Sequence, residues 1–205
     1  MKNKIRVPWG TFICLSVLLF PCSRLAAQTA LDVPYPADIP LSGDVQAVSA
    51  RIASLYGANA ETVELYVDAA LKLEGRIGIA APVILGIAIH ESSFKSDLFA
   101  NSGNPFGIKA GKPWTGPTFS KWEDGNETKF RVYGSAEEAI LDFSKFVRSR
   151  SWYADALSCP VDDSRCVIDG LKRTSLEPGY SLNPNWDESI MEIIQKVGLQ
   201  ALVTR

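Results

Sequence analysis

The chain has 205 residues and an ordinary globular composition, 46% hydrophobic and 21% charged, which suffices for one domain with a full core. Its formal net charge is −2, and removing residues 1–27 leaves 17 basic and 23 acidic residues, a net charge of −6. This acidic balance argues against nucleic acid or an anionic membrane as a partner.

Residues 1–27 have the pattern of a secretory signal peptide, with basic residues before an apolar run at 12–20 and a cleavage site after Ala27. The apolar run is too short to span a membrane. Lipidation at Cys22 is the alternative, and the bulky, stiff Pro21 before it disfavours that modification. We therefore expect an exported protein, periplasmic or extracellular, without stable membrane insertion.

The next segments predict an arm and two helices. Residues 28–41 contain several prolines without periodicity, which indicates a linker or an extended N-terminal arm. Ser42 is the expected N-cap of an amphipathic helix that Gly57 ends. Asn59 is expected to cap a second amphipathic helix that ends at Gly75. Core packing is the expected role of both helices.

The stretch from Pro82 to Ser93 is apolar on nearly every side until Glu91, which predicts a buried helix. Glu91 falls on the same helical face as Ile87 and Ala88, so its carboxyl extends an apolar stripe. Apolar surroundings disfavour the charged form and raise a carboxyl pKa. A glutamic acid that is protonated near neutral pH can act as a general acid.

His90 is the only histidine, and it neighbours Glu91 in sequence. Consecutive helix residues point about 100° apart, so the two side chains do not face one another. A single histidine without a cluster of cysteines or carboxylates argues against a metal site. We expect a structural histidine, no metal and no cofactor.

Residues 101–109 read Asn-Ser-Gly-Asn-Pro-Phe-Gly-Ile-Lys, which combines turn residues with the apolar Phe106 and Ile108. Buried anchors hold such a loop in one shape, and a loop of fixed shape is suited to lining a cleft.

Two further elements are predicted before residue 150. Residues 118–133 have β-type residues on either side of the turn Glu-Asp-Gly-Asn at 123–126, which indicates a β-hairpin. Ser135 opens a capping box with Glu138, and the helix that follows buries an apolar face as part of the core.

The C-terminal part contains a cysteine pair and a last helix. Cys159 and Cys166 are an even pair in an exported protein and are expected to form a disulfide; two free thiols are the alternative. Trp152 begins a short helical piece before them. Asn183 is expected to cap, and Pro184 to start, the last helix.

Three motifs occur in order along the sequence: Gly-Ile-Ala-Ala-Pro-Val-Ile-Leu-Gly-Ile-Ala-Ile-His-Glu-Ser at 78–92, Asn-Pro-Phe-Gly-Ile-Lys-Ala at 104–110 and Trp-Thr-Gly at 114–116. Together they resemble the glucosaminidase family of bacterial peptidoglycan hydrolases, which are endo-β-N-acetylglucosaminidases. The resemblance extends over about residues 60–202. It implies a predominantly helical α+β, lysozyme-like domain at 42–205, with a small β-hairpin beside the cleft.

The resemblance also implies catalytic roles. The family's catalytic acid falls on Glu91, and a second acidic residue is expected on the hairpin, where Glu123 is our choice. Asp124 and Glu127 lie in the same region, and a solvated turn acid is an equal alternative for Glu123. Tyr180 matches the family's tyrosine beside the catalytic glutamate.

Substrate contacts are implied at several further positions. Asn183 replaces an aspartate of the family's Tyr-Ala-Thr-Asp-Pro-x-Tyr segment, and Trp186 replaces its second tyrosine. Aromatic rings in loops or at element ends could stack on sugars, although we expect at least one of them to cap the core instead. The residues expected to bind substrate are Asn104, Phe106, Lys109, Trp114, Trp122, Asn183 and Trp186.

The function that the resemblance implies is hydrolysis of peptidoglycan glycan strands by a monomer, at the β-1,4 bond after N-acetylglucosamine. The counter-charge would come from Glu123 or from the substrate's own acetamido group. A lytic transglycosylase is one alternative, because Glu-Ser-Ser-Phe after a buried helix resembles that family too. Phe-Gly-Ile-Lys at 106–109 stands where those enzymes usually have Gly-Leu-Met-Gln. A non-catalytic wall-binding module is the other alternative.

Overall fold

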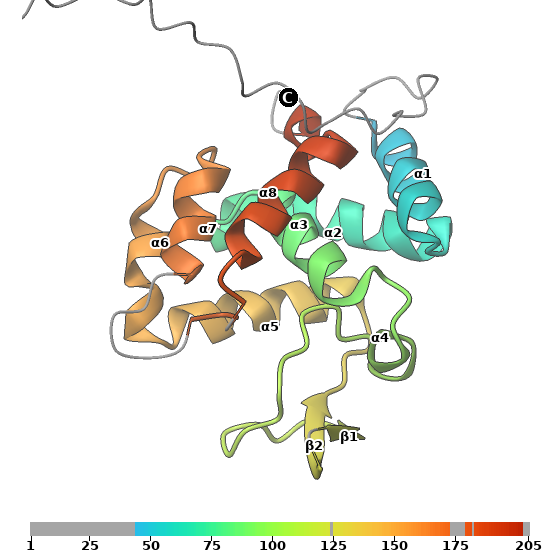
Figure 1. The fold of residues 1–205 in the computed structure, drawn as a ribbon, viewed down its shortest axis with the longest axis vertical. Coiled ribbons are helices and arrows are strands. Elements are labelled where there is room, and N and C mark those ends of the chain that lie inside the picture. The colour runs from blue at the N-terminus through green and yellow to red at the C-terminus, as the bar shows by residue number, and fades with distance from the viewer. Residues whose placement is uncertain (1–43, 124, 173–178, 182, 203–205) are drawn as a thin grey trace, which may run out of the picture. The chain divides into compact units, whose positions relative to one another are not determined.

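The computed structural model describes residues 44–202 except 124, 173–178 and 182. The expected signal peptide and the expected arm lie outside the described residues. The prediction of Ser42 as the first N-cap was wrong, because α1 begins at Val45 and its N-cap is Asp44. Within the described part, helices predominate beside one two-stranded antiparallel sheet, which confirms the α+β class (Figure 1). The elements are α1 Val45–Tyr56, α2 Ala60–Ile77, α3 Ala81–Ser92, α4 Asp97–Ser102, β1 Thr118–Glu123, β2 Asn126–Arg131, α5 Ala136–Arg148, η1 Ser151–Tyr153, α6 Ala154–Ser158, α7 Ser164–Lys172, α8 Trp186–Val197 and η2 Leu199–Leu202.

Helix α3 lies at the centre of the core. Every residue at 81–89 is buried, as the sequence predicted, and the helix packs against α2 and α8 (Figure 1). At Gly86 helices α3 and α8 approach so closely that an added Cβ would lie 3.0 Å from atoms of Ile190 and Ile194. Pro82 lies in the first turn of α3, where a missing N–H costs nothing.

The ends of the first two helices are set by local chemistry. Gly57 ends α1 in the left-handed conformation, and the Asn59 side chain accepts a hydrogen bond from Thr62 N–H, both as expected. The predicted end of α2 at Gly75 was wrong, because the helix continues to Ile77 and ends at Gly78 with φ +66°. A mid-helix glycine costs only about 1 kcal/mol, and the extra turn buries Ile77 in the core.

The predicted hairpin forms from β1 and β2, and the loop at 104–110 adds to its edge. Arg131 N–H donates to Ile108 C=O, Ala110 N–H donates to Lys129 C=O, and Phe130 is buried at the junction. Asp142 of α5 accepts hydrogen bonds from the side chains of Arg131, at 2.6 Å, and Tyr133, at 2.7 Å. The hairpin is therefore joined to both the loop and the helical body.

The capping box before α5 forms in a modified version. Glu138 N–H donates to the Ser135 hydroxyl at 3.2 Å, and the Glu138 carboxylate accepts from Gly134 N–H, one residue earlier than the box pattern requires. Ser135 is the N-cap, so the helix begins where the sequence predicted.

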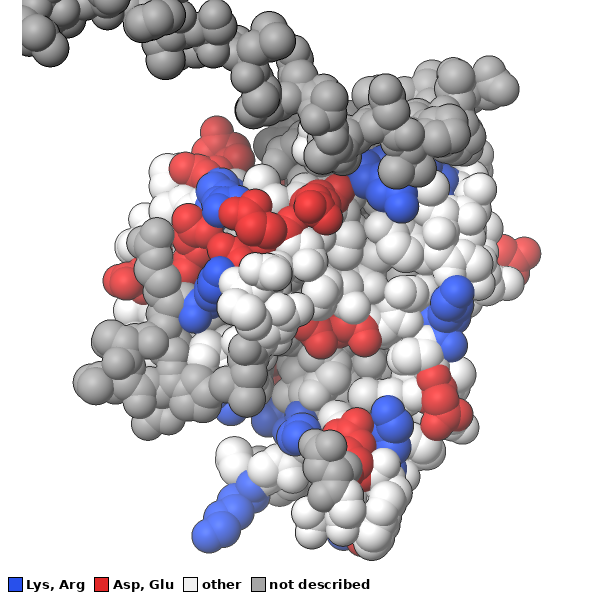
Figure 2. Space-filling model, viewed as in Figure 1, with Lys and Arg blue, Asp and Glu red and all other residues white. Residues whose placement is uncertain are grey.

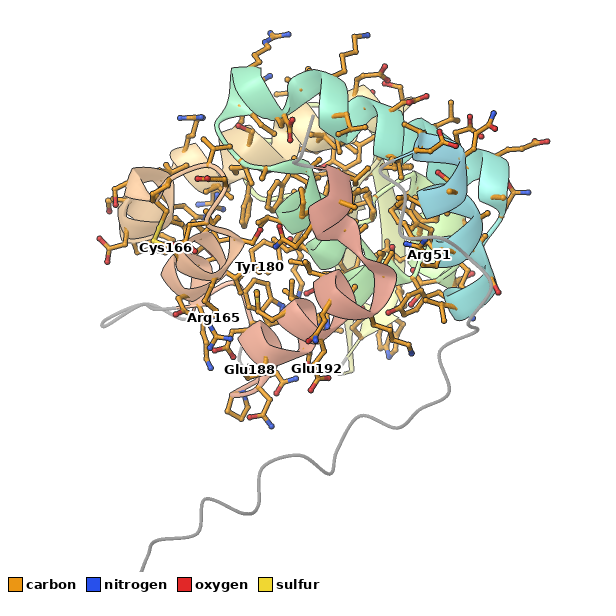
Figure 3. All side chains as sticks on the ribbon, turned by 90° about the horizontal axis from the view of Figure 1, so that it is seen from above. Arg51, Arg165, Cys166, Tyr180, Glu188 and Glu192 are labelled. Atoms are coloured by element: carbon orange, nitrogen blue, oxygen red, sulfur yellow. A yellow bond between two sulfur atoms is a disulfide. The ribbon has the colours of Figure 1, made fainter. Side chains whose placement is uncertain are left out.

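The C-terminal helices differ from the prediction in two respects. Helix α7 was not predicted; it packs against α6, and the Cys159–Cys166 disulfide ties its first turn to the end of α6. Helix α8 begins at Trp186 and not at Pro184, because Asn183 accepts a hydrogen bond from Asn185 N–H in the turn before the helix. Figure 3 shows Cys166 on the pair formed by α6 and α7.

Candidate active site

Glu91 lies in the last turn of α3, where the backbone leaves the core abruptly. Ser93 and Phe94 both have left-handed backbones, with φ of 50° and 51°, which is uncommon for residues other than glycine. The Ser92 hydroxyl donates to Ala88 C=O at 2.8 Å and accepts from Phe94 N–H at 3.1 Å. With Phe94 anchored in the core, this turn fixes the backbone around the predicted acid.

The carboxyl of Glu91 is held by Trp186. The indole N–H of Trp186 donates to Glu91 Oε1 at 2.9 Å. The residue reaches solvent, yet the protein atoms around its carboxyl raise the pKa of Glu91 above its usual value by removing water from the charged form. The Trp186 hydrogen bond and the charge of His90 oppose that rise without cancelling it. The protonated form is therefore favoured over a wider pH range than for a solvated glutamate.

Tyr180 and Trp186 form a stacked pair beside Glu91. Their ring centroids lie 5.2 Å apart with an interplanar angle of 28°, and Trp186 is fully buried. Tyr180 donates a hydrogen bond from its phenol to the backbone carbonyl of Phe106 at 2.8 Å. Burial, followed by the nearby charge of Glu91, raises the pKa of Tyr180 well above its usual value, so its phenol is a neutral donor. Figure 3 shows Tyr180 directed into the helical body.

The loop at 104–109 is organised from inside by Asn104. The Asn104 amide donates to Ile108 C=O and Arg131 C=O, at 3.0 and 3.1 Å, and its oxygen accepts from Ile108 N–H and Phe106 N–H. Phe106 stacks on Phe143 with ring centroids 4.5 Å apart. Asn104 and Phe106 are 0% and 2% exposed, so their side chains support the loop and offer almost no surface to a ligand.

Lys109, Trp122 and Glu123 lie on and beside the hairpin. Glu123 forms ion pairs with Lys109 and Lys121, at 4.0 and 3.3 Å. Trp122 is 73% exposed and pairs across the strands with Glu127. Since successive strand residues point to opposite faces, Glu123 and Trp122 cannot line the same surface. Trp122 shares its face with Glu127, and Glu123 shares its face with the lysines.

The two remaining predicted contacts have structural partners. The Trp114 indole N–H donates to Pro117 C=O at 3.0 Å, and the Arg131 guanidinium lies 4.9 Å from its ring centroid. Asn183 is exposed, and its side-chain oxygen accepts the Asn185 N–H at 3.0 Å.

The structure therefore brings the predicted residues into two groups. Glu91, Tyr180 and Trp186 lie together at the end of α3, and Phe106 joins them through its carbonyl. Lys109, Trp122 and Glu123 lie at the hairpin. Figure 2 shows a hollow between the helical body and the hairpin, with acidic side chains on both sides. A protonated carboxyl on one side of such a hollow and a carboxylate on the other can cleave a glycosidic bond.

Lys172 is a residue of this region that the sequence reasoning missed. Its ammonium group donates to Pro184 C=O and to the Asp187 carboxylate, each at 2.5 Å, and so holds the start of α8. No sequence motif links Lys172 to Pro184 or Asp187, so the sequence could not have identified this contact.

Among the described residues, no group of three or more histidine, cysteine or acidic side chains could hold a metal ion. None of the helices in the described ranges is both long enough and apolar enough to cross a membrane.

Comparison with known proteins places this arrangement in a family. The family model of glucosaminidase, described as mannosyl-glycoprotein endo-beta-N-acetylglucosaminidase, matches residues 67–199. That range is well over half of the sequence. No curated protein matched in a separate search.

Several solved structures share the fold. A peptidoglycan hydrolase from Sphingomonas sp. A1 has a TM-score of 0.56 and 24% identity, covering 71% of this protein and 97% of that one. The glycoside hydrolase domain of FlgJ from Salmonella typhimurium has a TM-score of 0.54 and 24% identity, covering 76% and 89%. The catalytic domain of the autolysin Auto from Listeria monocytogenes has a TM-score of 0.54 and 19% identity, covering 76% and 86%. This likeness confirms the predicted lysozyme-like fold.

Proposed function

This protein belongs to the glucosaminidase family of glycoside hydrolases, and from that premise we propose that it is exported and hydrolyses peptidoglycan at the β-1,4 bond after N-acetylglucosamine. The observation that carries the proposal is the carboxyl of Glu91, with a raised pKa and a fixed hydrogen bond from Trp186, at the end of the buried helix α3. Peptidoglycan as the substrate is supported by the likeness to the peptidoglycan hydrolase from Sphingomonas sp. A1.

Catalysis begins with protonated Glu91. Its proton passes to the glycosidic oxygen as the bond from that oxygen to the anomeric carbon breaks, and positive charge develops on the sugar that is left. Water then adds to the anomeric carbon and loses its proton to the carboxylate, which restores the acid. The product is a reducing N-acetylglucosamine end.

The positive charge on the sugar needs a negative partner. One candidate is Glu123, whose charge is shared with Lys109 and Lys121. The other is the acetamido oxygen of the substrate, which can attack the anomeric carbon internally. Because the two lysines already compensate the charge of Glu123, we favour the acetamido group as the nucleophile and Glu123 as an electrostatic contributor.

Export is the second part of the proposal. The signal-peptide pattern at 1–27 supports it, and the Cys159–Cys166 disulfide is the kind of bond that persists outside the cytoplasm. Comparing the mass of the protein recovered outside the cytoplasm with that of the full-length polypeptide tests it. The expected N-terminus is Gln28, and a lipid-modified Cys22 would replace this part of the proposal with the anchored form.

The identity of the new glycan ends tests the reaction. Purified peptidoglycan is digested, the fragments are reduced with borohydride, and mass spectrometry then identifies the sugar at each new end. We expect reduced N-acetylglucosamine from the wild-type protein and undigested peptidoglycan from Glu91→Gln. Anhydro-muramic acid ends would establish a lytic transglycosylase instead, and sedimentation with the wall without new ends would establish a binding module.

A further inference from the structure

We propose that Trp186 is a positioning residue for the general acid, because its indole N–H fixes which carboxyl oxygen of Glu91 carries the transferable proton. This inference deepens the proposed function and rests on it. It replaces the role in substrate contact that the sequence suggested for Trp186, since a fully buried ring has no surface on which a sugar could stack.

The indole of Trp186 limits how the carboxyl of Glu91 can hold its proton. An indole N–H is a donor only, whereas a hydroxyl can either donate or accept. The hydrogen bond from Trp186 to Glu91 Oε1 at 2.9 Å therefore requires a lone pair on Oε1 in both protonation states. In the neutral carboxyl the carbonyl oxygen is the stronger acceptor, so this hydrogen bond favours Oε1 as the carbonyl oxygen and places the proton on Oε2. The oxygen that faces away from Trp186 thus becomes the proton donor.

Trp186 can hold the carboxyl because its own position is fixed from two sides. On one side its ring stacks on Tyr180, and the phenol of Tyr180 donates to Phe106 C=O. On the other side Lys172 binds Pro184 C=O and the carboxylate of Asp187, directly before and after the start of α8. A donor that is fixed before the substrate arrives costs no reorganisation during the reaction.

The other titratable groups around Glu91 do not obscure the effect of Trp186 on the pKa of Glu91. From α3, the charge of His90 lowers the pKa of Glu91. From the segment before α8, Tyr180 has a pKa far above its usual value and stays neutral. On α8, Asp187 is neutralised by Lys172 at 2.5 Å. On the hairpin, the carboxylate of Glu123 is paired with two lysines.

Removing the indole N–H should therefore change the acid in a specific direction. A hydrogen bond from a donor stabilises the carboxylate more than the neutral acid, so its loss raises the pKa of Glu91. The carboxyl is also freed to rotate, and the proton is then distributed over both oxygens. A ring that served only as packing or as a sugar platform would produce neither effect.

The first experiment measures the pH dependence of Trp186→Phe, which keeps an aromatic ring and removes the N–H. Release of dye from dye-labelled purified peptidoglycan is followed at sub-saturating substrate, where the rate reports kcat/KM. We expect the alkaline limb of the profile to move up by about 1 pH unit and the rate at the optimum to fall roughly tenfold. The matched control is Trp152→Phe, at a 37% exposed tryptophan of η1, whose profile should equal that of the wild type. An unshifted limb in Trp186→Phe would refute the proposal.

The second experiment does not depend on activity or on the folding of Trp186→Phe. Indole N–H signals of the ¹⁵N-labelled protein from Gln28 onward are recorded against pH, and the Trp186 signal is assigned by elimination with Phe variants at Trp114, Trp122 and Trp152. We expect this signal to titrate in the wild type and to stay constant in Glu91→Gln, where the amide oxygen still accepts the hydrogen bond without titrating. A constant signal in the wild type, or a titration that persists in Glu91→Gln and so reports His90, would overturn the proposal.

The proposed reaction and the positioning role of Trp186 can be refuted independently of each other. If the Trp186 signal follows Glu91 while the digest contains no reducing N-acetylglucosamine ends, the proposed reaction is wrong and the hydrogen bond to the acid stands. If those ends form while the Trp186 indole N–H signal does not titrate with Glu91, the proposed reaction stands and Trp186 has no positioning role.

Discussion

Tyr180 donates a hydrogen bond from its phenol to the backbone carbonyl of Phe106 at 2.8 Å, across 74 positions of sequence. This bond joins the segment before α8 to the loop that Asn104 organises. Since the same tyrosine stacks on Trp186, which holds Glu91, the loop and the predicted acid share one support.

Tyr180→Phe should weaken that support without removing the ring. The carbonyl of Phe106 would lose its partner, which costs about 1–3 kcal/mol when the group remains buried. We expect a melting temperature several degrees lower, measured by circular dichroism, and a reduced rate of peptidoglycan digestion. Wild-type stability with a large loss of activity would instead indicate that the hydroxyl contacts the substrate directly.

Glu91→Gln should abolish hydrolysis of purified peptidoglycan, because the amide keeps the shape and the acceptor oxygen but has no proton to transfer. We expect a loss of about 10²–10⁴-fold in the rate of release of soluble fragments. Thermal unfolding checks that the variant is folded. Wild-type-like digestion by the folded variant would exclude Glu91 as the acid.

The same variant should gain stability relative to the wild type as the pH rises toward neutral. The pKa of Glu91 is raised in the folded state, so between the unfolded and folded pKa values the folded protein binds more protons, and stability falls as pH rises. Because Gln does not titrate, the stability of the variant does not fall in this way as the pH rises. The melting temperature of Glu91→Gln minus that of the wild type should therefore grow as the pH rises from the usual carboxyl range through the raised pKa of folded Glu91. A difference that is constant or that shrinks with pH would contradict the raised pKa.

The hairpin acids can be separated because they lie on opposite faces. Glu123→Gln should lower activity moderately if the acetamido group is the nucleophile, and severely if the carboxylate itself is required. Glu127→Gln is the matched control, since this residue lies on the face of Trp122. Initial rates on purified peptidoglycan are the measurement, and a greater loss in Glu127→Gln would transfer the role to that residue.

The Cys159–Cys166 disulfide should stabilise the fold and be dispensable for chemistry, because it joins the end of α6 to α7 and not the residues around Glu91. By loop-closure entropy, so short a loop contributes about 2–3 kcal/mol, so the double Ser variant should melt roughly 5–10 °C lower. Mass spectrometry of the unreduced protein detects the bond. Two free thiols would refute the pairing, and an inactive but folded double variant would refute its dispensability.

Much of the fold follows from local patterns in the sequence. The apolar run before Glu91 predicts a buried helix, and α3 is buried over residues 81–89. Asn59 and Gly57 bound their helices as expected, and the turn at 123–126 joins the two strands of the hairpin. Each of these features depends on residues within a few positions of one another, which is the range over which capping, turn formation and helical periodicity act.

The expected substrate contacts on the hairpin conflict with the alternation of side chains along a strand. Trp122 and Glu123 were both expected at the substrate, yet adjacent residues of one strand point to opposite faces. The Asn-x-Phe-Gly-Ile-Lys signature is a different case. Asn104 and Phe106 fall on it as expected, but their burial shows that they shape the loop from within.

The sequence by itself determined the presence of helices α1, α2, α3, α5 and α8, the hairpin, the cysteine pair and the position of the predicted acid at the end of a buried helix. Only the tertiary structure decided what surrounds that acid. The donor to Glu91 is 95 positions away in sequence, and it reaches the carboxyl because α8 packs against α3 at Gly86. No local propensity encodes such a contact, since it arises only when close packing brings two helices, distant in sequence, to one fixed separation.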